Sequence, residues 1–191
     1  MRLFIPAMLC VAGSAWADPM WAGAHGRVTE GQRIEVFAGP GSAGASFTTA
    51  AEPRAAWAAE FSWGFAGRTG ELRGAHLWQL NQTGFATVSA QLGVEVLLVP
   101  VGGLDLGAGP QLGLTLSLGG RRFNVDVGAQ LAVEAFVISG GPRVPLRAVL
   151  GLNGLISHVS VAVMARAGVD VEAGRPFVGR AEVVVALGWV R

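Results

Sequence analysis

Residues 104–119 read LDLGAGPQLGLTLSLG, and large apolar residues in this stretch alternate with glycine, hydroxyl, amide and acidic residues. Successive side chains of a β-strand point to opposite sides, so the two kinds of residue would fall on opposite faces. In a soluble sandwich or barrel the leucine face would form the core, and the other face would carry many charged residues. Here that second face holds one aspartate among small polar residues and glycines. We therefore expect the leucines to face lipid and the small residues to face the inside of a barrel.

The same alternation of apolar and small polar residues recurs along the chain. It begins at residues 33–38, is clear in residues 57–65, 85–99, 123–135, 159–171 and 177–189, and is weaker in residues 72–80 and 144–152. Short Gly-rich or Asn-rich turns separate these segments, with Asn153-Gly154 as a hairpin signal. We interpret residues 39–55 as a loop because of their Gly, Pro, Ser and Ala content. Pro110 cannot donate to a strand ladder, so we expect either a kink beside it or a strand that begins after it.

The composition supports a membrane location without a membrane helix. Only 14% of the residues are charged, against about 25% in typical soluble proteins, and the mean hydropathy is +0.48. After residue 17 no run of about 18 apolar residues occurs, which excludes a transmembrane helix. A closed β-barrel resolves this combination, because it leaves no unpaired strand edge in the hydrocarbon layer. We predict an all-β, up-and-down antiparallel transmembrane barrel.

The first residues are typical of a secretory signal peptide. Arg2 precedes a short apolar run, and Ala15 and Ala17 have the spacing of a cleavage site after residue 17. The rival interpretation, a lipoprotein signal ending at Cys10, is disfavoured by the bulky Leu9 before it. We therefore divide the chain into a signal peptide (1–17), an N-terminal segment (18–32) and a β-barrel (33–191).

The strand pattern resembles that of the small outer-membrane β-barrel proteins of Gram-negative bacteria, of the eight-stranded type. The resemblance rests on the signal peptide, the alternating strands, Gly-rich pieces such as LGAGPQLGL and the final segment FVGRAEVVVALGWVR. It implies an outer-membrane location, contact with outer-membrane lipid, recognition by the barrel-insertion machinery and an even number of strands. We expect eight strands, with one weak segment (72–80 or 144–152) lost, and keep ten as the alternative. We also expect a monomer.

Alternation assigns most charged residues of the strands to the lumen, where mixed signs would pair and fill a narrow barrel. The expected lining is Glu60, Glu95, Asp105, Asp126, Glu134, Arg147, Arg166, Asp170, Arg180 and Glu182. Trp57 and Phe65 share the opposite face about 26 Å apart, so we expect them, with Trp189, to mark the membrane interfaces.

The sequence holds few candidates for chemistry. We expect no metal site and no cofactor, because His25, His76 and His158 are far apart and Cys10, the one cysteine, leaves with the signal. All 14 basic residues are arginine and form no basic stripe, so we expect no nucleic-acid partner.

Three functions remain open. We favour a structural or interaction barrel without catalysis. The first alternative is an acyl hydrolase using His158, Ser160 and Glu172, since an acid-oriented histidine can activate a serine. This H-x-S pattern with a later acid is similar to the outer-membrane lipid A deacylases, although Val161 stands where their motif has Asn. The second alternative is a soluble periplasmic barrel that binds an apolar ligand.

Overall fold

The computed structural model is an all-β protein. It describes residues 31–52, 54–82, 85–100, 104–120, 122–139, 141–172 and 178–191, so the predicted signal peptide and His25 lie outside the described residues. No helix in the described ranges is long and apolar enough to cross a membrane. The strands are β1 (Gln32–Ala38), β2 (Ser42–Glu52), β3 (Ala55–Gly64), β4 (Thr69–Gln82), β5 (Ala86–Pro100), β6 (Leu104–Gly119), β7 (Phe123–Ala132), β8 (Glu134–Phe136), β9 (Pro142–Ile156), β10 (Val159–Glu172) and β11 (Val178–Val190).

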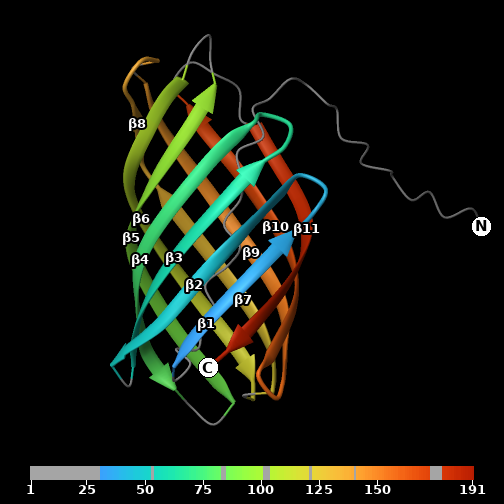
Figure 1. Cartoon of the computed structure of the whole chain (residues 1–191). Coiled ribbons are helices and arrows are strands. Elements are labelled where there is room, and N and C mark those ends of the chain that lie inside the picture. Colours follow the sequence, from blue (N-terminus) through green and yellow to red (C-terminus); the bar gives the residue numbers. More distant parts are fainter. Residues whose placement is uncertain are drawn as a thin grey trace, which may run out of the picture.

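The strands close into an up-and-down antiparallel barrel of ten strands (Figure 1). Consecutive strands of the ring pair with each other, with β7 paired to β9. β1 closes the ring by pairing with β11, from Arg33 opposite Val190 to Ala38 opposite Val185. The eleventh strand, β8, has three residues. It pairs with β6 and β9, the same two strands that β7 pairs with, so β7 and β8 occupy one position in the ring.

The expected strand number of eight is wrong, and the alternative of ten is confirmed. Residues 72–80 belong to the long strand β4, and residues 144–152 belong to the long strand β9. Neither segment is lost, because each is paired on both sides along most of its length. Their alternation is weaker because some inward positions are apolar, such as Leu77 and Val149.

Two further expectations about local structure are wrong. Residues 42–52, which we expected inside a loop, form β2, and this strand is paired on both sides. Its small residues allow close approach: a Cβ on Gly44 would lie 2.3 Å from the Phe61 carbonyl oxygen. Asn153-Gly154 lies within β9, and the chain turns at Ser157 and His158 instead, where Ser157 has a φ of 56°.

β6 runs through Pro110 without a shift in register. Gln111 faces Ala132 of β7 and Ala108 faces Ala135 of β8, so β7 and β8 follow one line along β6. The ladder is interrupted at Val133, which lies opposite Pro110 and donates its N–H to the Pro110 carbonyl at 3.1 Å. Proline has no N–H to donate in return, which explains why β7 and β8 are separate strands.

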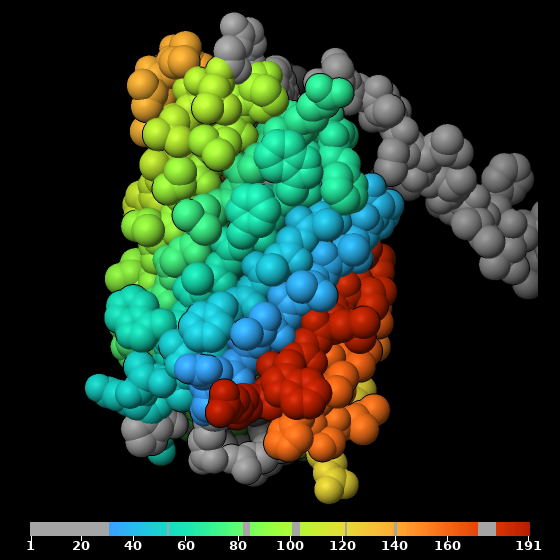
Figure 2. All heavy atoms as spheres, in the orientation of Figure 1, coloured from blue at the N-terminus to red at the C-terminus, as the bar shows by residue number. Residues whose placement is uncertain are grey.

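Apolar side chains cover the outside of the barrel, and polar side chains fill the inside. Along β6, Leu112 and Leu114 of the outer row are 54% and 58% exposed, whereas Gln111 and Ser117 of the inner row are buried. Figure 2 shows one side of the outer wall, with β1 to β6 across the front and β11 at the lower right. This orientation of the two rows is the one that the alternation predicts.

Candidate functional site

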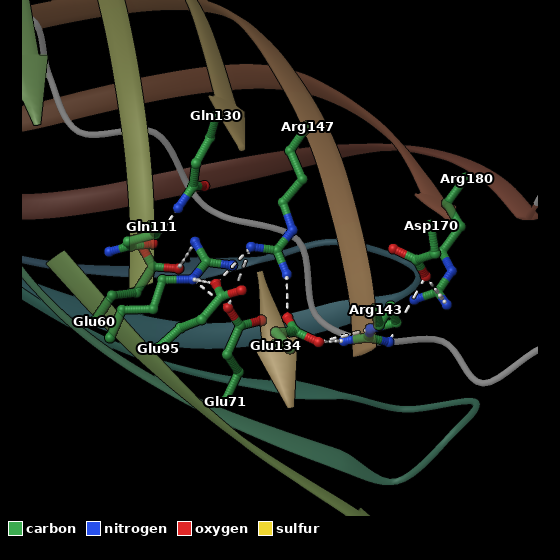
Figure 3. A network of polar contacts seen from close by, with 11 residues as sticks. Glu60, Glu71, Glu95, Gln111, Gln130, Glu134, Arg143, Arg147, Asp170 and Arg180 are labelled. Atoms are coloured by element: carbon green, nitrogen blue, oxygen red, sulfur yellow. Dashed lines mark hydrogen bonds and ion pairs between the residues drawn. The ribbon is translucent and has the colours of Figure 1, made fainter. Parts of the chain in front are cut away.

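The inside of the barrel holds a network of buried charged side chains (Figure 3). It links seven strands, because its members come from β3, β4, β5, β8, β9, β10 and β11. The members are Glu60, Glu71, Arg73, Glu95, Glu134, Arg143, Arg147, Asp170 and Arg180. Each points inward because it occupies the inner row of its strand.

Arg147 of β9 is the centre of this network. Its Nη1 lies 2.7 Å from Glu95 Oε2 and 3.7 Å from Glu71 Oε1, and its Nη2 lies 3.5 Å from Glu134 Oε1. The three carboxylates are at most 1% exposed. An unpaired carboxylate in such a place would be very unfavourable, so Arg147 makes the burial of all three possible.

Arg73 of β4 is the second shared cation. Its Nε donates a hydrogen bond to Glu71 Oε1 and lies 3.4 Å from Glu95 Oε2, while Nη1 lies 3.6 Å from Glu60 Oε1. Glu71 and Glu95 thus contact both Arg73 and Arg147. The four side chains form one unit whose pairs are expected to be coupled energetically.

The network continues from Glu134 towards one end of the barrel. Arg143 donates from Nε to Glu134 Oε2 at 2.6 Å, and its Nη1 lies 3.8 Å from Asp170 Oδ2. Arg180 Nη2 donates to the same Asp170 oxygen at 2.7 Å. The Asp170 and Arg180 side chains keep 16% and 17% exposure, so the network reaches from a dry interior to partly solvated positions.

A second group of contacts attaches the β1–β2 turn to β10 and β11. Arg166 Nη2 donates to Glu182 Oε1 at 2.7 Å and to Ser42 Oγ at 2.9 Å, and Ser42 Oγ donates to Glu182 at 3.0 Å. The Arg166 guanidinium also lies 5.2 Å from the centre of the Phe37 ring. These contacts help to hold the barrel closed at the end of β1, beside β11.

The remaining inward polar groups form local pairs. Asp126 accepts hydrogen bonds from Ser117, from Asn124 at 2.6 Å and from Asn153 at 2.8 Å. Asp105 accepts from the backbone N–H groups of Ile138 and Ser139 at 2.9 and 3.0 Å, and therefore anchors the turn after β8.

All ten predicted lining residues lie on the inner side of the barrel. Glu60, Glu95, Asp105, Asp126, Glu134, Arg147 and Arg166 are buried, and Asp170, Arg180 and Glu182 are partly buried.

The prediction missed several members of the lining. Glu71 lies before the expected segment 72–80, because β4 begins at Thr69. Arg73 lies within that segment, whose weak alternation did not indicate an inner row. A strict period of two from Thr69 through Glu71, Arg73, Ala75 and Leu77 would have found both. Arg143 was missed because β9 starts two residues before the expected segment.

The three residues of the hydrolase hypothesis are not brought together. β10 is one continuous strand, so Ser160 and Glu172 lie near its opposite ends, about 40 Å apart at the usual rise per residue. Ser160 is 1% exposed, and its hydroxyl donates a hydrogen bond to Glu35 Oε1 at 2.9 Å. His158 does not face the lumen; it is exposed in the turn before β10, and its ring stacks on that of Trp189.

The predicted interface aromatics point outward. Trp57, Phe65 and Trp189 are 57%, 49% and 57% exposed, with Trp57 in β3 and Phe65 just beyond its far end. His76 lies on the same outer face between Trp57 and Trp78, and the centroid of its ring is 4.4 Å from that of each tryptophan. The outer surface thus carries aromatic clusters near the strand ends.

The arrangement inside the barrel is suited to closing the lumen. The described residues contain no group of three or more His, Cys, Asp or Glu that could hold a metal ion. Opposite charges form pairs across the interior, so they neutralise one another.

The chain matches no known family model, and no curated protein matches it. The interpretation of this site therefore rests on its geometry.

Proposed function

We propose that this protein is an integral outer-membrane β-barrel of a Gram-negative bacterium, with a lumen closed by its ionic network and a structural or interaction role. The single observation that carries the proposal is the orientation of the barrel wall. In the described residues, 36 large apolar side chains are exposed on the outside, while glutamates and arginines are buried inside. Monomeric soluble proteins rarely expose contiguous apolar patches beyond a few hundred Å².

The soluble alternative is disfavoured by the same observation. A soluble barrel that binds an apolar ligand needs an apolar interior and a polar exterior. This barrel has the reverse arrangement, because its largest fully buried side chains include Arg166, Gln111, Glu71, Glu95 and Glu134. An apolar ligand inside would face these charged groups instead of a hydrocarbon lining.

The closed lumen follows from the charges that fill it. Five carboxyl groups and four guanidinium groups form one connected network, and most of them are almost fully removed from solvent. A conducting pore would keep such groups hydrated along a water-filled path. We therefore assign the function to the rims and the outer wall, and we propose insertion by the barrel-insertion machinery and a monomeric state.

Cell fractionation and gel mobility test this proposal. We expect the full-length protein, expressed in a Gram-negative host, to remain with the outer membrane after osmotic shock and to need detergent for release. An unboiled sample should migrate differently from a boiled one, because a closed barrel resists unfolding by detergent. Release in the osmotic-shock fluid without detergent would contradict the membrane location, and equal mobilities would contradict a stable closed barrel.

A further inference from the structure

One end of the barrel carries a patch in which exposed arginines meet exposed apolar side chains. We call it the rim patch and define it as Arg122, Phe123, His158, Trp189 and Arg191. It lies at the end where β11 finishes; in Figure 2 this end of β11 (red) adjoins the β9–β10 turn (orange). All five residues are exposed.

Backbone hydrogen bonds hold the parts of the rim patch together. The Leu155 N–H donates to the Arg122 carbonyl at 2.8 Å, which joins the β6–β7 turn to the end of β9. The Val190 N–H donates to the His158 carbonyl at 2.8 Å, which joins the β9–β10 turn to the end of β11. The His158 and Trp189 rings stack with centroids 5.8 Å apart. The patch is therefore composed of neighbouring turns in a fixed arrangement.

Among the described residues, no carboxylate neutralises the arginines of the rim patch. Neither Arg122 nor Arg191 forms an ion pair with the described residues, in contrast to the arginines of the lumen. The other exposed charges of this rim in the described residues are Arg54 and Glu52. The rim thus keeps a net positive charge that attracts anions.

An apolar surface begins directly at these arginines. Ile156 is 73% exposed, Phe123 is 58% exposed and Val159 is 40% exposed, all at the same rim. Trp189 lies between the two kinds of surface, and tryptophan is the residue enriched at boundaries between hydrocarbon and water. A matching ligand must carry an anionic group and an apolar chain side by side.

We propose that the rim patch binds anionic phospholipids, with a phosphate at each of Arg122 and Arg191 and acyl chains along Phe123, Ile156 and Val159. This proposal rests on the proposed membrane location. A free phosphate would use the arginines but would leave the adjoining apolar surface uncovered. Guanidinium groups bind phosphate through paired hydrogen bonds, so arginine is the suitable cation here.

Native mass spectrometry of the folded full-length barrel in detergent, titrated with phosphatidylglycerol or phosphatidylcholine, tests the proposal. We expect tighter binding of phosphatidylglycerol, and about fivefold weaker binding after Arg122→Gln or Arg191→Gln, since one arginine near an anionic surface contributes about that factor. Arg68→Gln removes an exposed charge at the opposite end and serves as the matched control, with unchanged binding expected.

The possible outcomes separate this proposal from the membrane location. Equal affinity for the two lipids, or an equal loss in Arg68→Gln, would overturn the rim patch as a lipid site. Competition by soluble glycerol phosphate at the same concentration would also overturn it, because the acyl chains would then contribute nothing. Wild-type and variant barrels are first shown to be heat-modifiable on gels. A wild-type protein with the same mobility before and after boiling would contradict the stable closed barrel, not the lipid site.

Discussion

At the scale of single residues, the cost of burying charge decides what each inner side chain does. Arg147 contacts three buried carboxylates, so Arg147→Gln would leave them with too few cations. We expect a loss of about 3–5 kcal/mol in the free energy of unfolding, as for other broken buried ion pairs. Urea unfolding in detergent micelles measures this value. The exposed variant Arg68→Gln should keep the wild-type midpoint, and a similar loss there would show that the network is not the cause.

Ser160 separates a structural role from a catalytic one. Its hydroxyl donates to Glu35, which also accepts from Arg33 at 2.6 Å. We expect Ser160→Ala to lower the free energy of unfolding by about 1.5–3 kcal/mol, the range for hydrogen bonds to charged groups. We also expect the wild-type barrel to release no fatty acid from outer-membrane lipid, as assayed by chromatography. Fatty-acid release by the wild type that disappears in Ser160→Ala would restore the hydrolase hypothesis.

At the scale of strands, close backbone contact explains Gly109 of β6. A Cβ on Gly109 would lie 1.7 Å from the Val133 carbonyl oxygen, whereas one on Gly74 of β4 would meet nothing within 4 Å. Gly109→Ala should therefore destabilise the barrel by about 1–3 kcal/mol or more, because β6 and the β7–β8 line must separate. Gly74→Ala is the matched control and should not destabilise it. Comparable urea midpoints for the two variants would contradict the assigned register.

The outer row of β6 provides a test of burial in lipid. Leu112 lies in the middle of β6 and Leu104 at its first residue, and both are exposed. We expect Leu112→Arg to oppose folding into phospholipid vesicles by about 2–4 kcal/mol, and Leu104→Arg by about 0–1 kcal/mol, since the cost depends on depth. Equilibrium folding into vesicles, followed by tryptophan fluorescence, gives both values. A soluble barrel would show no such difference between the two positions.

At the scale of the whole molecule, the network determines whether the barrel conducts ions. We expect the wild-type barrel to give little conductance in planar bilayers. Arg147→Ala should raise the conductance and favour cations, because Glu71, Glu95 and Glu134 would then line the opened space without this cation. Arg122→Ala at the rim is the control and should leave the lumen closed. An anion-selective or unchanged current in heat-modifiable Arg147→Ala would count against the closed-lumen proposal.

The alternation of residues was enough to predict the strands and the orientation of their faces. Side-chain direction in an extended strand is a local property with a period of two, so it can be found in segments such as 104–119 without knowledge of the partners. For the same reason, the alternation identified lining residues such as Glu95 and Arg166. It failed at β2, where small residues on both faces carry too little contrast to mark a strand.

Only the tertiary structure decided the number of strands and the pairing of the charges. Glu95 and Arg147 are 52 residues apart in the chain and meet because the barrel closes with one particular register. Closure is a non-local property: β2 becomes a strand because β1 and β3 supply hydrogen-bond partners on both sides, which its own composition does not indicate. The sequence by itself determined the inward and outward faces of the strands whose alternation is clear. The closed barrel then determined which of them touch, because that depends on backbone pairing between distant segments.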